Sequence, residues 1–452
     1  MKRKAIGISR KLISLSLVLI LVLGTFGTTY GAINVVEDME VLVIRSGAWF
    51  ETAYTEWNAV EDAVGYNVYI KSHSAADSAY EKLDNELIRQ YPNYWRADAL
   101  GLAAGQYIMK VEAIFEDGSR IHTVTNSVRV EAHDRSGFAF SSDSTYKTGS
   151  GAYNDDGTLR DGAQVIYVTS ETAKTVALDV KVDSKGKIEK AVGIGAILKL
   201  RQKGYDKTPL AIRFVGQITE SDMSGQLNSN GYIEVKGRNA YEEMNITLEG
   251  VGKDAYASGW GFLIRNGGNV EVRNMGIMLF PDDGVSLDTN NCNVWVHNND
   301  FFYGTAGGDA DQAKGDGSAD IKGTSTYVTF SYNHFWDSGK SSLCGMTKES
   351  EFFVTYHHNW FDHSDSRHPR IRTGSIHIYN NYFDGISKYG VGTTMGSSAF
   401  VEANDFRNAK YPMLSSKQGT DALGNDIFSG ETGGMIKAFN NRVEGAGSLI
   451  YA

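Results

Sequence analysis

An Asn-x-aromatic step recurs through the C-terminal part of the chain and restricts the fold more than any other feature. The copies are Asn299/Phe301, Asn333/Phe335, Asn359/Phe361, Asn381/Phe383 and Asn404/Phe406, with a weaker Asn441/Val443 and an earlier Asn274 in "VRNMGI". Successive asparagines lie 22 to 37 residues apart. A minimum spacing with variable excess is typical of a solenoid whose coils carry loop insertions.

The repeated asparagines have a structural interpretation. In each coil the asparagine is expected at a turn, where its amide bonds the amide of the next coil. The aromatic residue two positions later is expected to stack inside. Only 5 prolines occur in 452 residues, which suits strands that need every N–H for pairing. We therefore predict an all-β chain with a right-handed parallel β-helix over residues 140–452.

Residues 38–135 follow a different pattern of short alternating strands and turn residues. After an early Trp57, Tyr66, Val68 and Ile70 fall at alternating positions, which is the period of a strand with one buried face. A second alternating run, "GQYIMKVEAIF", follows a glycine turn. This part resembles a fibronectin type III module, so we predict a small β-sandwich. Its sequence has no catalytic cluster, which favours a spacer or a weak sugar-binding accessory.

The start of the chain predicts export. Lys2, Arg3 and Lys4 precede an apolar run of 12 residues from Leu12 to Leu23, which is too short to span a bilayer. We interpret residues 1–32 as a signal peptide and expect a secreted, extracellular monomer with no membrane contact after cleavage. The formal net charge of −10 argues against nucleic acid as a partner, because phosphate binding needs a basic face.

The two cysteines leave two alternatives open. Cys292 and Cys344 are the whole cysteine content of the chain. An exported protein could pair them, but cysteine is also a common small core residue.

Acidic residues beside glycines have two interpretations, an ordinary turn or a cation site. Asp316 and Asp320 stand four positions apart in "KGDGSAD", and on an extended strand they would lie about 13 Å apart. The glycines at 315 and 317 permit a turn that brings both carboxylates to one hard cation. Calcium takes about 6–8 oxygen ligands, so a third carboxylate is needed.

Basic residues are concentrated in "SDSRHPRIRTG". Arg370 and Arg372 are two positions apart and share one face of a strand, while Ile371 points into the core. Arg367 precedes Pro369 on the approach to that strand. Because the arginine fork suits planar anions, this segment is expected to face carboxylates or phosphates.

These segments, in order, resemble polysaccharide lyase family 1, the pectate lyases. The matching motifs are "DGSAD", "YVTFSYNHF", "DSGKSSLCG", "TYHHN", "RHPRIRTG" and "HIYNNYF". Upstream, "TPLAIRFVGQI", "NITLEGVG" and "NVWVHNNDFF" also match. The resemblance covers about residues 160–445.

The resemblance implies a function and a set of site residues. It implies a calcium-dependent pectate lyase that cleaves α-1,4-linked polygalacturonate by β-elimination and leaves 4,5-unsaturated oligogalacturonates. The implied Ca²⁺ ligands are Asp283, Asp316 and Asp320; the implied catalytic residues are Arg367 as base with Lys340 and Arg372; and the implied substrate-binding residues are Lys340, Arg370 and Arg372. An arginine base implies an alkaline optimum, since arginine is ordinarily protonated.

Two other functions remain as alternatives. A polygalacturonase-type hydrolase would use a pair of acidic residues for general acid and water activation, and Asp282 with Asp283 offers such a pair. A non-catalytic polysaccharide-binding β-helix would bind the polymer without turnover and would not need Arg367 and Lys340 together. A lyase for methyl-esterified pectin is disfavoured, because an ester carries no charge for a cation to neutralise.

Overall fold

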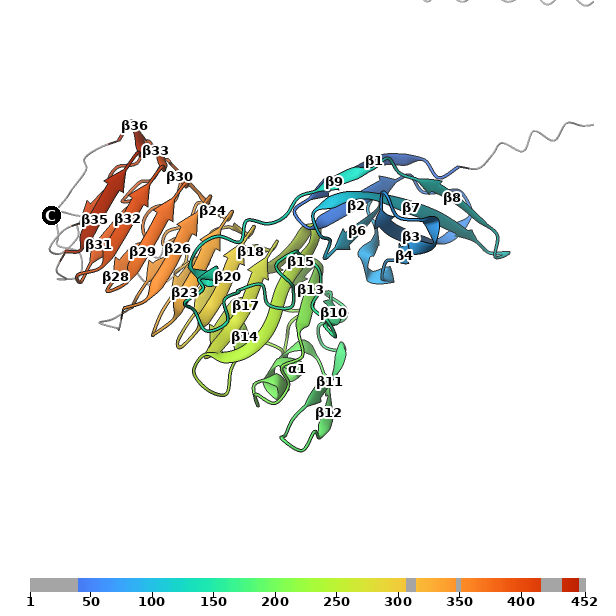
Figure 1. Ribbon diagram of the computed structural model, residues 1–452, viewed down its shortest axis with the longest axis horizontal. Coiled ribbons are helices and arrows are strands. Elements are labelled where there is room, and N and C mark those ends of the chain that lie inside the picture. Colours follow the sequence, from blue (N-terminus) through green and yellow to red (C-terminus); the bar gives the residue numbers. More distant parts are fainter. Residues whose placement is uncertain (1–39, 306–313, 347–350, 416–432, 447–452) are drawn as a thin grey trace, which may run out of the picture. The chain divides into compact units, whose positions relative to one another are not determined.

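The computed structural model describes residues 40–305, 314–346, 351–415 and 433–446. The predicted signal peptide, residues 1–32, lies outside these ranges. The regular secondary structure of the described residues is almost entirely β-strand (Figure 1), with one α-helix, α1 (Ile194–Arg201), among them. The prediction of an all-β chain is confirmed.

The N-terminal part contains two antiparallel sheets with the strand orders β1-β2-β6-β5 and β4-β3-β7-β8, where β9 also pairs with β7. Their shared core includes Trp57, Tyr66, Val68 and Ile70, as the alternating pattern predicted. The strands are β1 (Val43–Trp49), β2 (Thr52–Trp57), β3 (Ala63–Ser72), β4 (Glu81–Lys82), β5 (Ile88–Gln90), β6 (Trp95–Leu100), β7 (Gly105–Phe115), β8 (Arg120–Val124) and β9 (Val128–Val130).

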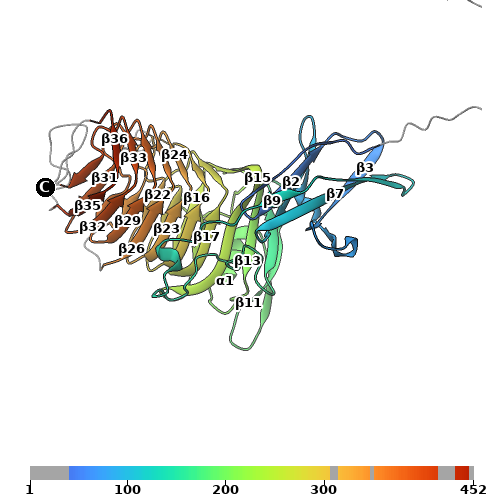
Figure 2. The ribbon, with the colours of Figure 1, turned by 45° about the horizontal axis from the view of Figure 1, so that its top comes forward.

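The rest of the chain winds into a parallel β-helix, whose coils follow one another in sequence order (Figures 1 and 2). A 17-stranded parallel sheet contains two rows of strands. The first row is β10 (Gln164–Val168), β13 (Leu210–Thr219), β15 (Glu242–Ser258), β17 (Gly267–Arg273), β20 (Cys292–His297), β23 (Thr326–Ser331), β26 (Phe353–His357), β29 (Ser375–Tyr379), β32 (Ser398–Glu402) and β35 (Met435–Phe439). The second row is β18 (Gly276–Met278), β21 (Asp300–Phe301), β24 (His334–Trp336), β27 (Trp360–Asp362), β30 (Tyr382–Asp384), β33 (Asp405–Arg407) and β36 (Arg442–Glu444).

A separate 8-stranded parallel sheet forms another wall of the β-helix. We call it the site sheet. Its strands are β14 (Tyr232–Lys236), β16 (Gly261–Arg265), β19 (Val285–Leu287), β22 (Ala319–Ile321), β25 (Leu343–Cys344), β28 (Arg370–Arg372), β31 (Val391–Thr394) and β34 (Met413–Ser415). A short antiparallel pair, β11 (Ala177–Lys181) and β12 (Ile188–Val192), lies beside α1 at the first coils.

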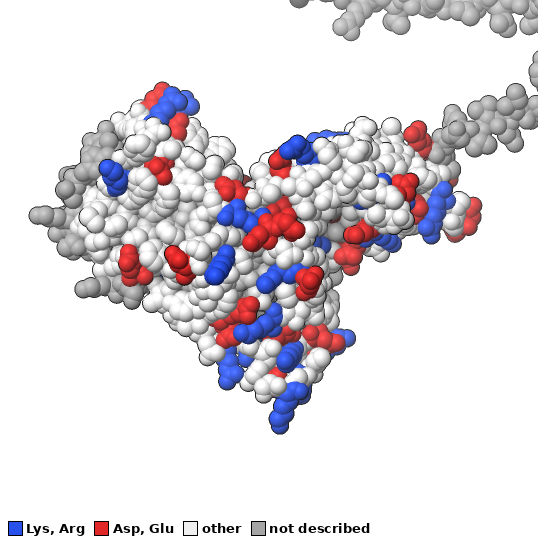
Figure 3. Space-filling view, in the orientation of Figure 1, with Lys and Arg blue, Asp and Glu red and all other residues white. Residues whose placement is uncertain are grey.

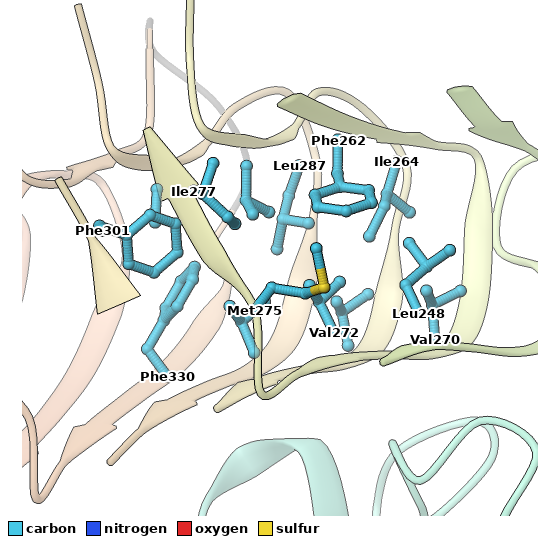
Figure 4. Packing of buried hydrophobic residues seen from close by; sticks show 14 of the residues in the cluster. Leu248, Phe262, Ile264, Val270, Val272, Met275, Ile277, Leu287, Phe301 and Phe330 are labelled. Atoms are coloured by element: carbon cyan, nitrogen blue, oxygen red, sulfur yellow. The ribbon is translucent and has the colours of Figure 1, made fainter. Parts of the chain in front are cut away.

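The interior of the β-helix is apolar. Phe262 and Ile264 on β16 and Leu248 on β15 point into the coil (Figure 4) and are fully buried. Cys292 and Cys344 are buried thiols on β20 and β25, with no disulfide between them. Over the ranges that the structure describes, no helix is long and apolar enough to cross a membrane. Charged side chains of both signs lie side by side over the early coils in Figure 3.

The asparagine ladder forms as predicted from Asn299 to Asn441. Each amide donates to the amide oxygen of the next coil at 3.0–3.1 Å. The same oxygen also accepts the backbone N–H of the preceding asparagine, as Asn359 Oδ1 does from Asn333 at 3.1 Å. The ladder therefore satisfies buried polar groups at every turn.

The phenylalanines also stack as predicted. The rings of Phe301, Phe335, Phe361, Phe383 and Phe406 lie parallel, with centroids 4.3–4.9 Å apart. This spacing is close to the ~4.8 Å between paired strands. The stack therefore follows the strand pairing from coil to coil.

Asn274 was wrongly included in the ladder. In the structure, Met275 takes that position, because its N–H donates to Asn299 Oδ1 at 3.0 Å. Asn274 lies one residue earlier at φ +53 and donates to Gly250 and Gly252 carbonyls. It is equivalent to Asn298, which also has a left-handed backbone.

The linker, residues 131–163, connects β9 to β10 and is hydrogen-bonded to the outer face of the first row. The N–H groups of Phe138, Ala139 and Ala152 each donate to a threonine hydroxyl of the sheet at 3.0 Å. Threonine hydroxyls of the sheet thus accept backbone N–H groups that would otherwise bond to water, in a segment with little regular structure.

The ladder predicts a large loss of stability on removal of one amide. We expect Asn359→Ala to lower the free energy of unfolding by roughly 2–4 kcal/mol, because buried polar groups on both adjacent coils lose their partners. Urea unfolding measures the change. Asn58→Ala, at an exposed position, is the control. Equal stability of the two variants would contradict the role of the ladder.

Candidate active site

The site sheet brings together all the residues predicted for the site. Asp283 lies just before β19, Asp316 just before β22, Lys340 before β25 and Arg367 before β28. The strands pair in parallel, and bridges join Gly317 to Lys340 and Lys340 to Ser366. Residues distant in sequence therefore occupy neighbouring positions on one wall.

Three carboxylates form a group that can hold a cation. Asp282, Asp283 and Asp316 each offer one oxygen, and these oxygens lie within 4.8 Å of one another. Asp283 is fully buried, and its Oδ1 has no hydrogen-bond partner. A buried carboxylate oxygen without a partner is costly, so a hard cation bound by oxygen ligands fits this position.

Asp320 lies on β22, next to the carboxylate group but outside it. The turn at Gly315, with φ +92, brings Asp316 to Asp283. Asp320 is not in the close group, although its charge acts on Asp283. Its Oδ1 accepts the N–H of Leu343 at 2.8 Å. A side chain at Gly317 would overlap the Asp320 carboxylate, so glycine is required there.

Lys322 is a member of the site that the sequence analysis missed. It forms an ion pair with Asp283, and its Nζ lies 4.0 Å from Asp320 Oδ2. Lys322 stands two positions after Asp320, so both share one face of an extended segment. This two-residue spacing from Asp320 was the feature of the sequence that could have identified Lys322. Asp282 was considered only as part of a hydrolase pair, whereas here it belongs to the carboxylate group.

Burial changes the proton affinity of the carboxylates. Burial, with the neighbouring charge of Asp320, raises the pKa of Asp283 to about 7. Burial also raises the pKa of Asp320, against the lowering effects of Lys322 and Arg367. Two buried carboxylates in one site disfavour each other's ionised form, and a bound cation would relieve this.

The basic residues surround the carboxylates on the adjacent coils. Lys340 is buried, and its Nζ lies 3.3 Å from Asp316 Oδ1. Arg370 and Arg372 are also buried, and Arg372 Nη1 donates to the Gly345 carbonyl at 3.1 Å. Arg367 is partly exposed and has φ +64. The site thus combines a cation position with a row of cationic side chains.

Comparison with known proteins assigns the family. A family model described as pectate lyase matches residues 122–449. The chain belongs to the pectate lyase family. The resemblance inferred from the sequence motifs is therefore confirmed for this part of the chain.

Individual relatives agree with this family. The chain is 33% identical over 247 residues to a pectate trisaccharide-lyase of Bacillus licheniformis, covering 53% of this chain and 68% of the relative. It is 29% identical over 286 residues to pectate lyase 3 of Pectobacterium atrosepticum, covering 58% and 70%. The crystal structure of pectate lyase Bsp165PelA from Bacillus sp. N165, in complex with trigalacturonate, matches with a TM-score of 0.52 and 25% identity, over 69% of this chain and 88% of that one.

The raised pKa of Asp283 predicts pH-dependent cation binding. Below about pH 7 Asp283 carries a proton in the ion-free protein, and a cation must displace it. We expect calcium affinity to fall as the pH drops, by up to ~10-fold per unit below 7. Calorimetric titration with calcium at pH 8 and pH 6 measures this. Equal affinity at the two pH values would contradict the prediction.

The Lys322 ion pair predicts competition with calcium. The ammonium group already neutralises Asp283, so calcium has to displace it. We expect Lys322→Met to bind calcium roughly tenfold more tightly, because a unit charge has left the site. Exposed Lys185 provides the control variant Lys185→Met, which should bind calcium like the unchanged protein. Weaker binding by Lys322→Met would show that Lys322 assists the cation instead.

Proposed function

We propose that this protein is a calcium-dependent pectate lyase that cleaves α-1,4-linked polygalacturonate by β-elimination and releases 4,5-unsaturated oligogalacturonates. The observation that carries the proposal is the grouping of Asp282, Asp283 and Asp316 next to the buried Lys340. A polymer with a carboxylate on every ring suits a site that pairs a cation position with lysine and arginine side chains.

The reaction sets one main electrostatic demand. Removal of the C5 proton places negative charge next to the ring carboxylate; the electron pair then forms the C4–C5 double bond as the C4–oxygen bond breaks. Calcium held by Asp283, Asp316 and Asp320, with Asp282 close by, would supply positive charge at the substrate carboxylate. Lys340 and Arg372 add cationic hydrogen-bond donors on the same wall, and Arg370 is a further contact to the substrate.

Arg367 is the proposed base. It belongs to the same wall as Lys340 and lies before β28. It is partly exposed, so a polymer on this face can reach it. Arginine is protonated in ordinary surroundings, so an arginine base can accept a proton only after it has lost its own. We therefore expect turnover to rise toward alkaline pH.

The alternatives make different products. A hydrolase using Asp282 and Asp283 would release saturated ends and would need both carboxylates for acid and base roles. Their grouping with Asp316 and the contact of Lys322 with Asp283 favour a cation site over that pair. A non-catalytic binding protein would hold the polymer and release no products.

The remaining parts of the chain have proposed roles of their own. Residues 1–32 are proposed to be a signal peptide that sends the enzyme out of the cell, where its polymeric substrate is found. Residues 38–135 are proposed to be a fibronectin type III-like module that acts as a spacer or weak sugar-binding accessory. The enzyme is proposed to act as a monomer and to bind neither nucleic acid nor membrane.

Removal of the base predicts a large loss of elimination. We expect the near-ultraviolet absorbance of polygalacturonate, which reports the new double bond, to rise with the unchanged protein at alkaline pH in calcium. Arg367→Ala is expected to lower the rate at least ~10²-fold, the usual size of a lost general base. Chelation of calcium is expected to abolish the rise.

The controls separate chemistry from binding. Arg129→Ala, at an exposed arginine of β9, should leave the rate unchanged. Binding of polygalacturonate is measured in parallel for each variant. Polymer binding without any absorbance rise under all conditions would refute the lyase proposal and favour the binding protein, whereas new reducing ends without absorbance would favour the hydrolase.

A further inference from the structure

A second cluster of metal-ligand side chains lies away from the site sheet. Asp134 comes from the linker, His357 ends β26 in the first row, and His358 follows it. The Nδ1 atoms of the two histidines are 2.9 Å apart, and Asp134 Oδ2 lies 3.9 Å from His357 Nδ1. One ligand atom from each residue lies within 4.8 Å of the others. The residues of the proposed active site take no part in this cluster.

Ring stacking fixes the two imidazoles. His357 stacks on Tyr379 with centroids 5.0 Å apart and an interplanar angle of 4°. His358 stacks on Tyr332 at 4.7 Å and 2°. The two imidazoles themselves are nearly perpendicular, at 85°. Because neighbours hold both rings, little rotational freedom is left to lose on binding a ligand.

The facing atoms bond to their neighbours in the ion-free protein: one histidine Nδ1 donates to the other at 2.9 Å, and Tyr332 Oη donates to Asp134 Oδ2 at 3.5 Å. A bound ion would replace these contacts. Asp134 Oδ1 accepts the N–H of Ser136 at 3.1 Å, which leaves Oδ2 turned toward the histidines. The Ser136 hydroxyl lies 3.5 Å from His357 Nε2 and 2.8 Å from Tyr379 Oη. A proton on His357 Nε2 makes its Nδ1 the acceptor of the bond from His358, and the same lone pair can bind a metal, as is usual for metal-binding histidines.

We propose that Asp134, His357 and His358 form a binding site for a first-row transition metal ion of the Zn²⁺ class. Two imidazole nitrogens and one carboxylate suit zinc, with a fourth position open to water. Calcium prefers oxygen ligands alone, so this site and the carboxylate group select different ions. Two nitrogens on a tetrahedral zinc ion lie about 3.3 Å apart, so the facing Nδ1 atoms need to separate only slightly.

The proposed ion links the linker to the β-helix. Asp134 lies at the start of the linker, and His357 is part of the first row. A metal bound by both holds this end of the linker against β26. Because the ligands come together only in the folded chain, zinc should stabilise the native state.

Calorimetric titration with zinc tests the site. The full-length chain is stripped with chelator and then kept in excess calcium to occupy the carboxylate group. We expect one zinc ion per chain, and at least tenfold weaker binding in Asp134→Asn and His358→Asn. Asparagine tolerates the left-handed backbone of His358 at φ +54. His363→Asn is the matched control, because His363 also has positive φ and contacts a carboxylate, Asp362.

Two further measurements support or overturn the proposal without using enzyme activity. Cobalt in place of zinc should give the strong visible absorption of a site with four or five ligands, and Asp134→Asn should lose it. Zinc should raise the melting temperature of the unchanged protein and of His363→Asn, but not that of Asp134→Asn. No zinc uptake by the unchanged protein, or equal uptake by Asp134→Asn and His358→Asn, would overturn the site.

Discussion

Parallel pairing from one coil to the next is the interaction on which the rest of the structure depends. Each coil repeats its backbone hydrogen bonds at about 4.8 Å, and the ladder from Asn299 to Asn441 satisfies the polar groups at the turn. Because pairing is in register, residues of different coils meet at the same place on a wall. Strand pairing alone therefore brings Asp283 and Lys340 to the same wall, which is the site sheet.

The site concentrates like charges and then compensates them. Asp283 and Asp320 are buried close enough to affect each other's ionisation, and Lys322 neutralises part of that charge. A buried charge is tolerated when it is paired. In this protein the pairing group can be exchanged, because either the Lys322 ammonium or a divalent cation can neutralise the Asp283 carboxylate. Stability and cation binding are therefore coupled at one position.

Periodic features could be predicted from the sequence, and contacts across long sequence distances could not. The spacing of the asparagines predicted both the amide ladder and the stack from Phe301 to Phe406. It failed at Asn274, because Met275 occupies the ladder position there. Motif order placed Asp283, Lys340 and Arg367 on one wall, but it did not indicate that Asp282 belongs to the same carboxylate group as Asp316. Asp134 could not be predicted to meet His357, since no period relates the linker to the coils.

The variable length of the coils has a consequence for how this fold can change. Asn299 and Asn333 are 34 residues apart, whereas Asn359 and Asn381 are 22 apart, yet both pairs make the same amide contact. Loop closure costs only about 0.6 kcal/mol for each doubling of length. Insertions of this kind can change the surface around Asp316 while the pairing between coils stays the same. Lengthening one coil at a time can therefore alter the surface beside the carboxylate group without disturbing the asparagine ladder.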